Sequence, residues 1–440
     1  MWAEPDDYSI KFYTRDSYFV LLPHRRANNN VYTQIARVSV KPDFSTGRET
    51  FLQMGDYDVE KIHAFDDENS KIYFTAAAPI PSQRHLFVTH AKAELDNAIT
   101  ANCITCQMET NCTFHEVNFS PRGKNFYLNC KGPGTPHMML SSIESNFSIL
   151  GEYGRNSVLE SMTRSHLFPR VLYENVTLSN GHVSMVKMLL PYGLDRQAVD
   201  KHYPVLVDVY GGPGTQKVTE EWFSNNIDIY FASSKEYVIV FIDGRGSGYR
   251  GWRQKQPLYG NLGTVEVDDQ IETISALLKR HRFLDSRNVA IWGWSYGGFV
   301  SARVVQRDPK RIFKCAISIA PVTNFKYYGT RKILYTHSNL DATYTERYMG
   351  TASSEAYQNT DLSRNVSAFH NVKYLLAHGT GDENVHFQNT AEFVKALTSD
   401  NVQFELMIYP DESHNLFSGR WHLYNMLDQF LNNCFHTHLS

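Results

Sequence analysis

The residues of this sequence that could do chemistry centre on one serine. Ser295 is the middle residue of a G-x-S-x-G pentapeptide at 293–297, which follows an apolar run at 289–292 and precedes a helical pattern at 299–306. Glycines on both sides of a serine let a strand turn sharply into a helix and leave the hydroxyl exposed above the sheet. A glycine-rich turn whose serine only caps a helix is the structural alternative. The strand before Ser295 and the helix after it favour a nucleophile.

A nucleophilic serine needs a histidine base, and the base needs a carboxylate that orients it, because a serine hydroxyl is barely ionised at neutral pH. Asp382 comes shortly after an apolar run at 374–377, and His414 shortly after a run at 404–408. The chain order serine, acid, histidine, each just past a strand, is that of α/β hydrolases. We therefore expect Asp382 and His414 to complete a triad. His378 and His386 flank the acid and are the alternative bases.

An oxyanion site is expected where the first strands of the same fold end. The segment Y-G-G-P-G at 210–214 follows an apolar run at 205–210, which is where this fold normally supplies one oxyanion donor. The backbone N–H of Tyr296 should be the other donor. Taken alone, the glycines could equally form an ordinary turn.

Elements that could position these residues occupy the second part of the chain. After about residue 164, apolar strands alternate with amphipathic helices, of which 265–278 and 390–397 are the clearest. This alternation predicts an α/β hydrolase with a doubly wound, mostly parallel sheet at 166–440. The expected strands are 205–210, 237–242, 289–292, 315–319, 374–377 and 404–408.

The first part, residues 1–165, has short β-rich runs separated by turns. Their spacing predicts antiparallel blades of four strands, and at ~40 to 50 residues a blade the segment makes roughly three. A closed ring needs four to eight, so we expect a partial β-propeller. The expected strands are 17–22, 32–40, 71–75, 84–89, 115–119, 125–129 and 138–142.

The composition excludes several classes of protein. The chain has 440 residues, 42% of them apolar, so it is long enough for two or three domains. Its formal net charge is −3, which excludes a protein that binds nucleic acid through bulk positive charge. No apolar run approaches the ~18 residues of a membrane span, and the first residues resemble no secretory leader.

The cysteines and sequons, in contrast, point outside the cytosol. An even set of six cysteines favours disulfides, although the four between 103 and 130 could also be read as a zinc cluster. Secretory features without a leader lead us to expect a truncated chain. The five Asn-x-Ser/Thr sites are Asn111, Asn118, Asn146, Asn175 and Asn365.

Long motifs occur through the second part of the chain: D-V-Y-G-G-P at 208–213, D-G-R-G-S-G-Y at 243–249, G-W-S-Y-G-G at 293–298, Y-T-E-R-Y-M-G at 344–350, H-G-T at 378–380 with Asp382, and N-V-H-F at 384–387. Through these motifs the stretch 203–435 resembles the dipeptidyl peptidase IV branch of the prolyl oligopeptidase family. The first part has C-x-x-C at 103–106 and C-x-G-P-G at 130–134, and chiefly through these it resembles the closing blades of that family's eight-bladed propeller.

The resemblance implies a serine peptidase that releases Xaa-Pro or Xaa-Ala dipeptides from peptide N-termini through an acyl-enzyme. The catalytic residues would be Ser295, Asp382 and His414, and the Tyr210 hydroxyl would join the Tyr296 amide in the oxyanion hole. It implies no cofactor, no metal and no nucleic-acid partner. Asn384 would bind the substrate carbonyl, and the walls of a proline-sized pocket would be Tyr296, Val322, Phe325, Tyr328, Tyr344, Tyr348 and Val385.

The resemblance also implies a setting for the protein. It suggests an extracellular or cell-surface location, with a type II membrane anchor and a homodimer in the full-length form. The implied disulfides are Cys103 to Cys106, Cys112 to Cys130, and Cys315 to Cys434.

Two departures from the family keep other functions open. The chain carries extra residues at 329–343, with Gly329 where an acidic residue is typical, and Phe325 replaces a usual tryptophan. Family members with a small residue at the position of Gly329 tend to accept longer substrates. A post-proline endopeptidase or an esterase on the same triad is therefore the alternative. A non-catalytic cell-surface homologue is another, although the presence of Ser295 argues against it.

The family's remaining substrate contacts have no match before residue 165. These are a glutamate pair that holds the substrate's amine and an arginine that grips a backbone carbonyl. Three blades also leave unpaired strand edges, which invite aggregation. We therefore expect the 440 residues expressed alone to show weak dipeptidyl peptidase activity and poor solubility.

Overall fold

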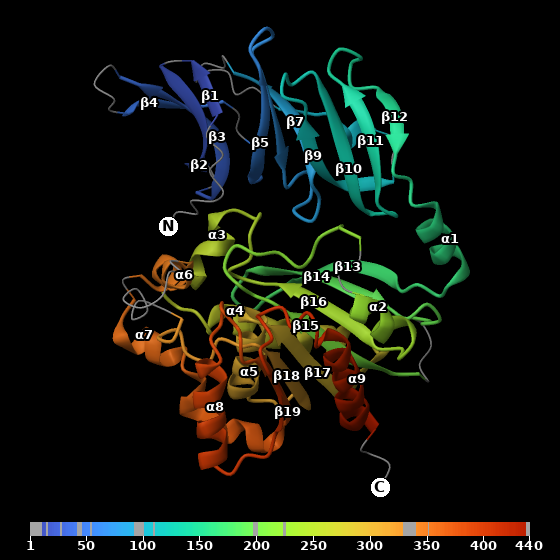
Figure 1. The fold of residues 1–440 in the computed structure, drawn as a ribbon, viewed down its shortest axis with the longest axis vertical. Coiled ribbons are helices and arrows are strands. Elements are labelled where there is room, and N and C mark those ends of the chain that lie inside the picture. The colour runs from blue at the N-terminus through green and yellow to red at the C-terminus, as the bar shows by residue number, and fades with distance from the viewer. Residues whose placement is uncertain are drawn as a thin grey trace.

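Three small β-sheets lie above one large sheet that carries helices on both faces (Figure 1). Among the residues described, no helix is long and apolar enough to cross a membrane. The structure, a computed structural model, describes residues 11–14, 16–26, 29–41, 46–52, 55–91, 101–108, 111–196, 201–222, 226–328, 340–350 and 352–436.

The first part of the chain forms three antiparallel sheets of four strands each, which confirms the predicted partial propeller. Strands adjacent in each sheet are consecutive in the chain, as in propeller blades. Blade 1 consists of β1 (Lys11–Thr14), β2 (Ser17–Arg25), β3 (Val31–Val40) and β4 (Thr46–Phe51). Blade 2 consists of β5 (Val59–Asp66), β6 (Lys71–Ala76), β7 (His85–His90) and β8 (Asn102–Cys103). Blade 3 consists of β9 (Cys112–Phe119), β10 (Asn125–Pro133), β11 (His137–Ser142) and β12 (Ile149–Tyr153).

The blades pack face to face through alternating side chains of β6. Phe74 points to one side and joins Phe19 and Ile35 of blade 1, whereas Tyr73 points to the other side and joins Phe126 of blade 3. Successive residues of a strand face opposite sides of its sheet, so one strand contributes to both interfaces. Blade 2 is therefore buried between its neighbours.

The large sheet has eight strands in the order β13-β14-β16-β15-β17-β18-β19-β20. β14 is antiparallel to both its neighbours, and all strand pairs from β16 to β20 are parallel. This confirms the predicted hydrolase sheet. Its strands are β13 (Arg170–Thr177), β14 (Val183–Leu190), β15 (Tyr203–Val209), β16 (Val238–Asp243), β17 (Leu284–Trp294), β18 (Cys315–Ile319), β19 (Lys373–Gly379) and β20 (Glu405–Tyr409).

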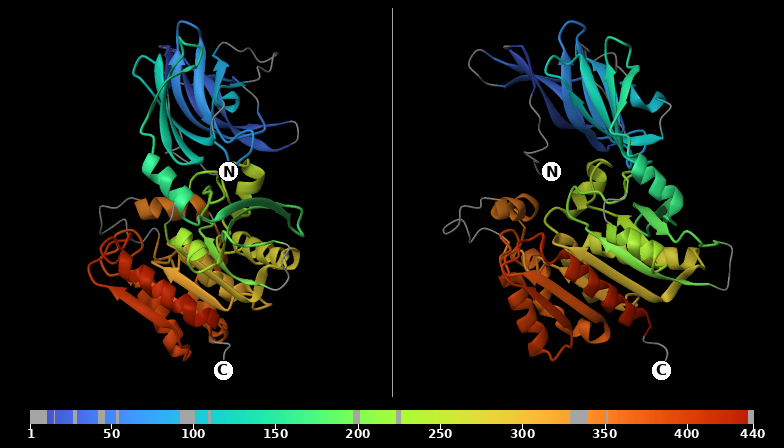
Figure 2. Two further views of the ribbon diagram at one scale, coloured as in Figure 1. Left: turned by 90° about the vertical axis from the view of Figure 1, so that its right-hand side faces the viewer. Right: turned by 45° about the vertical axis from the view of Figure 1, so that its right-hand side comes forward.

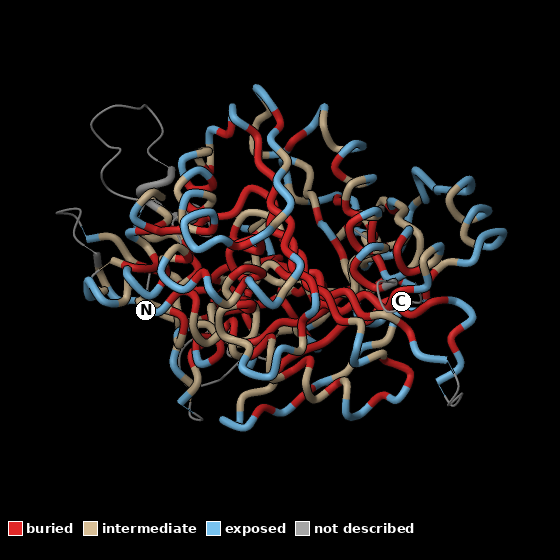
Figure 3. Tube along the Cα trace, turned by 90° about the horizontal axis from the view of Figure 1, so that it is seen from below, coloured by how far each residue is buried: buried red, intermediate tan, exposed pale blue. Residues whose placement is uncertain are grey.

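Helices cover both faces of this sheet, so that buried residues gather along its middle (Figure 3). One face packs against α4 (Val265–Arg280), α5 (Tyr296–Arg307) and α8 (Gln388–Ser399). The other face packs against α2 (Asn226–Ser233) and α9 (Arg420–His436). The remaining helices are α1 (Ser157–Ser165), η2 (Thr105–Gln107), α3 (Trp252–Lys255), η3 (Gln256–Leu258), α6 (Leu340–Met349), α7 (Ser354–Asn359) and η5 (Leu362–Asn371).

Helix α1 links the blades to the large sheet (Figure 2). None of its residues is buried, and β12 ends just before it while β13 begins just after it. We propose that the domain boundary lies at its end, near residue 165, with 1–165 and 166–440 as the two domains. The extra loop expected at 329–343 falls on residues that are not described up to 339, and α6 begins at Leu340.

Partly buried polar contacts join the blades to the hydrolase domain. Glu220 accepts hydrogen bonds from Ser82 Oγ at 2.9 Å, Gln83 Nε2 at 3.0 Å and Thr113 Oγ1 at 2.5 Å. The guanidinium of Arg84 lies 3.9 Å from the centre of the Tyr249 ring. Because these groups are partly buried and pair across the two parts, they favour one relative position of the blades and the hydrolase domain.

The cysteines pair as the resemblance implied: Cys103 with Cys106, Cys112 with Cys130, and Cys315 with Cys434. The last pair joins β18 to α9 across 119 residues. It therefore ties the C-terminal helix to the centre of the large sheet.

Replacing both Cys315 and Cys434 by serine should lower the free energy of unfolding by roughly 4 to 5 kcal/mol, because the chain-entropy cost of closing a loop grows with its length. Equilibrium unfolding in urea without reductant measures the loss. The matched control is the double serine variant of Cys103 and Cys106, whose separation is only 3 residues. Equal losses in the two double variants would contradict the loop-length argument.

Candidate active site

Ser295 lies at a strained turn between β17 and α5. Its φ of 61° and ψ of −119° are unusual for a residue with a side chain. A Cβ placed on Gly293 would lie 2.3 Å from the Gly297 carbonyl, and one on Gly297 would lie 2.2 Å from the Val209 oxygen. Only glycine fits at these two positions. The turn thus has the geometry of a nucleophile elbow, which exposes the serine side chain at the carboxyl edge of the sheet.

The predicted acid and base meet beside this elbow. Asp382 follows β19 and His414 follows β20, and His414 Nδ1 lies 2.6 Å from Asp382 Oδ2. The Asp382 side chain is 0% exposed and that of His414 is 11% exposed. The indole N–H of Trp294 donates to the His414 carbonyl at 3.0 Å, which fixes the histidine loop against the residue before Ser295.

Asp382 is held as a carboxylate. Its Oδ1 accepts the backbone N–H groups of Asn384 at 2.9 Å and Val385 at 2.8 Å. Burial alone would raise the pKa of Asp382, but hydrogen bonds from His378 and His414 outweigh it and lower the pKa to about 2. The group therefore remains negatively charged at neutral pH.

The contact between nucleophile and base is not made in this structure. Within the described residues, no hydrogen bond joins the Ser295 hydroxyl to His414. Such contacts are often long without substrate and tighten in the reacting complex. The structure therefore brings acid and base together, and brings both to the edge at which Ser295 lies.

The geometry separates the alternative bases from His414. His378 also bonds Asp382, but its side chain is 0% exposed and its other ring nitrogen lies 2.7 Å from Thr390 Oγ1. A ring enclosed in this way cannot reach substrate. His386 lies at the start of α8, where its carbonyl accepts the Asn389 N–H at 2.9 Å. Of the three, His414 alone combines the bond to Asp382 with an exposed edge.

The candidate oxyanion donors lie on either side of the elbow. The rings of Tyr210 and Tyr296 are 6.2 Å apart between centres. Burial raises the pKa of Tyr210, so its hydroxyl keeps its proton and can donate. A Cβ on Gly212 would lie 2.6 Å from the Tyr210 ring, so glycine is needed there. The N–H of Tyr296 is the first of α5 and has no acceptor within the helix.

The aromatic residues expected to line the proline pocket form one continuous chain of contacts. Centre-to-centre distances are 5.9 Å from Tyr296 to Phe325, 6.4 Å from Phe325 to Tyr328, 5.5 Å from Tyr328 to Tyr344 and 4.7 Å from Tyr344 to Tyr348. Phe325 is 0% exposed, so it supports the wall from behind. Val322 and Val385 are buried in the same cluster.

Asn384 has a fixed orientation next to these rings. Its Oδ1 accepts the Tyr328 hydroxyl at 2.6 Å. The amide oxygen is thereby occupied, which leaves the Nδ2 group to donate. An amide held in this way can bind a substrate carbonyl, as the resemblance implied.

Two residues support the site in ways that the sequence analysis did not predict. One is His378, which was expected only as an alternative base and is instead a second partner of Asp382. The other is Glu266, which is 2% exposed and accepts the Tyr296 hydroxyl at 2.8 Å and the Gly263 N–H at 2.6 Å. Burial raises the pKa of Glu266 to about 7 against these hydrogen bonds. A glutamate in the first turn of a helix is too common to single it out from sequence.

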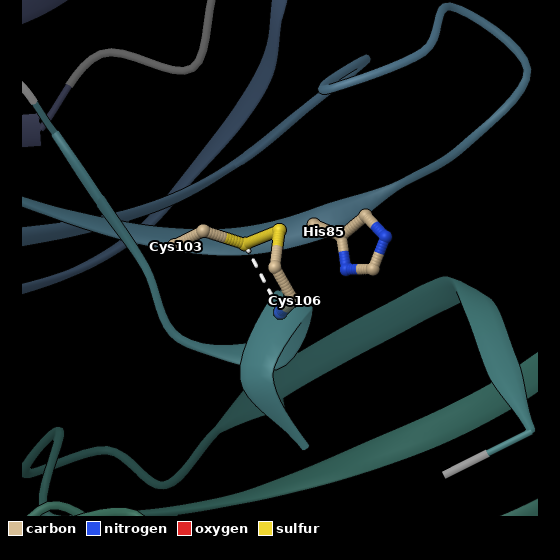
Figure 4. Close-up of side chains that lie close together, drawn as sticks. All are labelled: His85, Cys103 and Cys106. Carbon is tan, nitrogen blue, oxygen red and sulfur yellow. Dashed lines mark hydrogen bonds between the residues drawn. A yellow bond between two sulfur atoms is a disulfide. The ribbon is translucent and has the colours of Figure 1, made fainter. Parts of the chain in front are cut away.

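One group of potential metal ligands occurs in the described residues, at the end of blade 2. His85, Cys103 and Cys106 lie close together (Figure 4). The two sulfur atoms are bonded to each other, so they are not thiolate ligands here. The structure thus favours the disulfide over the zinc reading of these cysteines.

Comparison with known proteins identifies two families in the chain. The model of the "Prolyl oligopeptidase family" matches residues 222–438, and that of the "Dipeptidyl peptidase IV (DPP IV) N-terminal region" matches residues 1–137. Dipeptidyl peptidase family member 1 of Caenorhabditis elegans is 37% identical over 441 residues, which cover 99% of this chain and 53% of that protein. Dipeptidyl peptidase 4 of Felis catus is 34% identical over 419 residues, which cover 93% of this chain and 51% of that protein.

Solved structures share the fold. Dipeptidyl peptidase 4 of Porphyromonas gingivalis superposes with a TM-score of 0.81 at 24% identity, over 97% of this chain and 55% of that one. The chain spans about half the length of the curated relatives it matches.

Proposed function

Because this chain belongs to the dipeptidyl peptidase IV branch of the prolyl oligopeptidase family, we propose that it acts as a serine dipeptidyl peptidase on peptides with proline or alanine at the penultimate position. The observation that carries the proposal is the 2.6 Å bond between Asp382 and His414 beside the elbow of Ser295. An orienting carboxylate, an imidazole and a serine at a strained turn are the parts of an acyl-transfer site.

In the proposed reaction, His414 takes the Ser295 proton while Oγ attacks the carbonyl carbon of the scissile bond. Negative charge then develops on the carbonyl oxygen, where the Tyr210 hydroxyl and the Tyr296 N–H can donate to it. The protonated His414 gives its proton to the leaving amine, and an acyl-enzyme remains. A water molecule, deprotonated by His414, hydrolyses the ester and frees Ser295.

The pocket chemistry supports a preference for proline. The residues that we propose as its walls are mostly aromatic, among them Tyr296, Tyr344 and Tyr348, and they pack together. Such walls suit a flat pyrrolidine ring that carries no N–H. A cavity of about 240 Å³ between blades 1 and 2 and the hydrolase domain reaches Tyr348, and Asp58 and Glu60 lie on its blade side. The chain of a bound peptide can therefore extend from the pocket toward the blades.

The experiment that tests the function compares Gly-Pro amides with free and with blocked amines. We expect the full-length protein to turn over the free-amine substrate faster, as an exopeptidase does, and the 440 residues alone to show weak activity. The Ser295→Ala variant is the control for contaminating peptidases. A preference for the blocked amine would show that the protein is a post-proline endopeptidase and not a dipeptidyl peptidase. Hydrolysis of simple esters, with no hydrolysis of either Gly-Pro amide, would favour an esterase.

We also propose that the full-length protein is a homodimer at the cell surface or outside the cell. Three disulfides and the exposed sequon residues Asn111 and Asn175 support an oxidising, secretory setting. β20 is the outer strand of the large sheet, and near it the apolar side chains of Phe417 and Trp421 are 76% and 81% exposed. Light scattering on the full-length protein tests the dimer. We propose a type II membrane anchor for the same full-length protein.

A further inference from the structure

Asp382 is bonded to a second histidine that the proposed reaction does not use. His378 lies near the end of β19, and its Nε2 is 3.0 Å from Asp382 Oδ2. The same oxygen accepts the bond from His414 Nδ1 at 2.6 Å. Two imidazole rings, one buried and one at the exposed edge, therefore share a single carboxylate oxygen.

The surroundings of His378 settle which of its nitrogens carries the proton. Its Nε2 also lies 2.8 Å from the Val385 carbonyl oxygen, which can only accept. The proton is therefore on Nε2, which donates toward Asp382 and Val385. The opposite nitrogen, Nδ1, then accepts from the Thr390 hydroxyl at 2.7 Å. A neutral ring in one tautomer satisfies every contact.

These bonds fix the carboxylate without the help of His414. Oδ1 is held by the backbone N–H groups of Asn384 and Val385, and Oδ2 is held by His378. Rotation of the carboxylate would break bonds at both oxygens in a place that water does not reach. His414, which lies on a loop and changes its charge during the proposed reaction, thus meets an acceptor whose position does not change.

We propose that His378 is a positioning residue, which with Thr390 holds Asp382 Oδ2 toward His414 so that the imidazole is aligned with Ser295. The inference deepens the proposed function and rests on it. His378 transfers no proton and does not touch substrate. Its effect should therefore fall on the reactivity of Ser295 and on kcat, with little effect on KM.

The first test replaces the donor while keeping the volume of the side chain. His378→Met should slow both labelling by a fluorophosphonate and kcat by about 10- to 100-fold, the range known for residues that position metal ligands, as His378 would position Asp382. His378→Gln places an amide N–H near the position of Nε2 and should recover most of that loss. KM for the Gly-Pro amide should change less than twofold in both variants, because the pocket walls are untouched.

The second test changes Thr390, which contacts Nδ1 on the other side of the His378 ring. Thr390→Val removes the hydroxyl that fixes the tautomer and should slow labelling, whereas Thr390→Ser should keep it. His115→Met is the matched control for loss of a buried histidine, since His115 is 2% exposed and lies in β9 of blade 3. It should leave the labelling rate unchanged.

The outcomes separate this inference from the proposed function, because the fluorophosphonate reports Ser295 reactivity whatever peptide is preferred. A wild-type protein that is not labelled overturns both. A labelled wild type with an equally reactive His378→Met variant overturns the positioning role alone. Equal losses in the Met and Gln variants, accompanied by a lower melting temperature, would show that His378 serves only the packing of the core.

Discussion

Ser295→Ala should abolish hydrolysis of Gly-Pro amides and covalent labelling by a fluorophosphonate. The expected loss in kcat is about 10⁶-fold, as when the nucleophile of a serine protease is removed. The physical reason is that an imidazole oriented by Asp382 can activate a hydroxyl but not a methyl group. The small side chain of alanine leaves the rest of the elbow intact, so the fold should not change.

The matched control for this result is Ser301→Ala on α5, the helix that follows Ser295. Ser301 is 0% exposed and its Oγ lies 3.4 Å from the Ile291 carbonyl, so its loss removes a buried hydroxyl without touching the edge of the sheet. Labelling at the wild-type rate is expected in this control. Labelling that persists in Ser295→Ala would place the nucleophile at another residue.

The positions of Ser295, Asp382 and His414 could be predicted because each follows a strand whose apolar run is visible in the sequence. Parallel strands carry their carboxyl ends to one edge, so chain order and strand ends were enough to bring the three together. The same reasoning named His378 only as an alternative base, not as a support of Asp382, and it did not reach Glu266. Their significance comes from a hydrogen-bond partner supplied by another segment, and a single sequence does not contain that pairing.

Two strands of the large sheet also escaped prediction, for a different reason. In β14 (Val183–Leu190) all residues but the first are buried, including the polar Ser184 and Lys187. The segment therefore shows neither the alternation of a half-buried strand nor an unbroken apolar run. β13 (Arg170–Thr177) is an edge strand whose burial alternates, but its exposed face carries the apolar Val171 and Tyr173, so the alternation is not visible in the sequence. The partial propeller was predicted as an architecture from its short strands and turns, but five of its twelve strands, β1, β4, β5, β8 and β12, were not among the expected ones.

Besides its role in the proposed reaction, Asp382 should affect how the free energy of unfolding depends on pH. Its pKa is lowered to about 2 from an ordinary value of 3.8, so the folded state binds its proton less readily than the unfolded chain. The resulting stabilisation is fully present above about pH 4 and is lost as the pH falls toward 2. In Asp382→Asn this part of the acid dependence should be absent from unfolding measured between these pH values.

The same variant, Asp382→Asn, should reduce kcat by about 10⁴-fold, because an amide can present its NH₂ to His414 and favour the wrong tautomer of the imidazole. Labelling by a fluorophosphonate should become slow rather than absent, since Ser295, His414 and both oxyanion donors remain. Time courses of labelling and of amide hydrolysis measure the two rates. Asp411→Asn, an exposed carboxylate on the loop that carries His414, is the control and should keep wild-type rates. If Asp382→Asn retained full activity, the carboxylate that orients His414 would have to be another one.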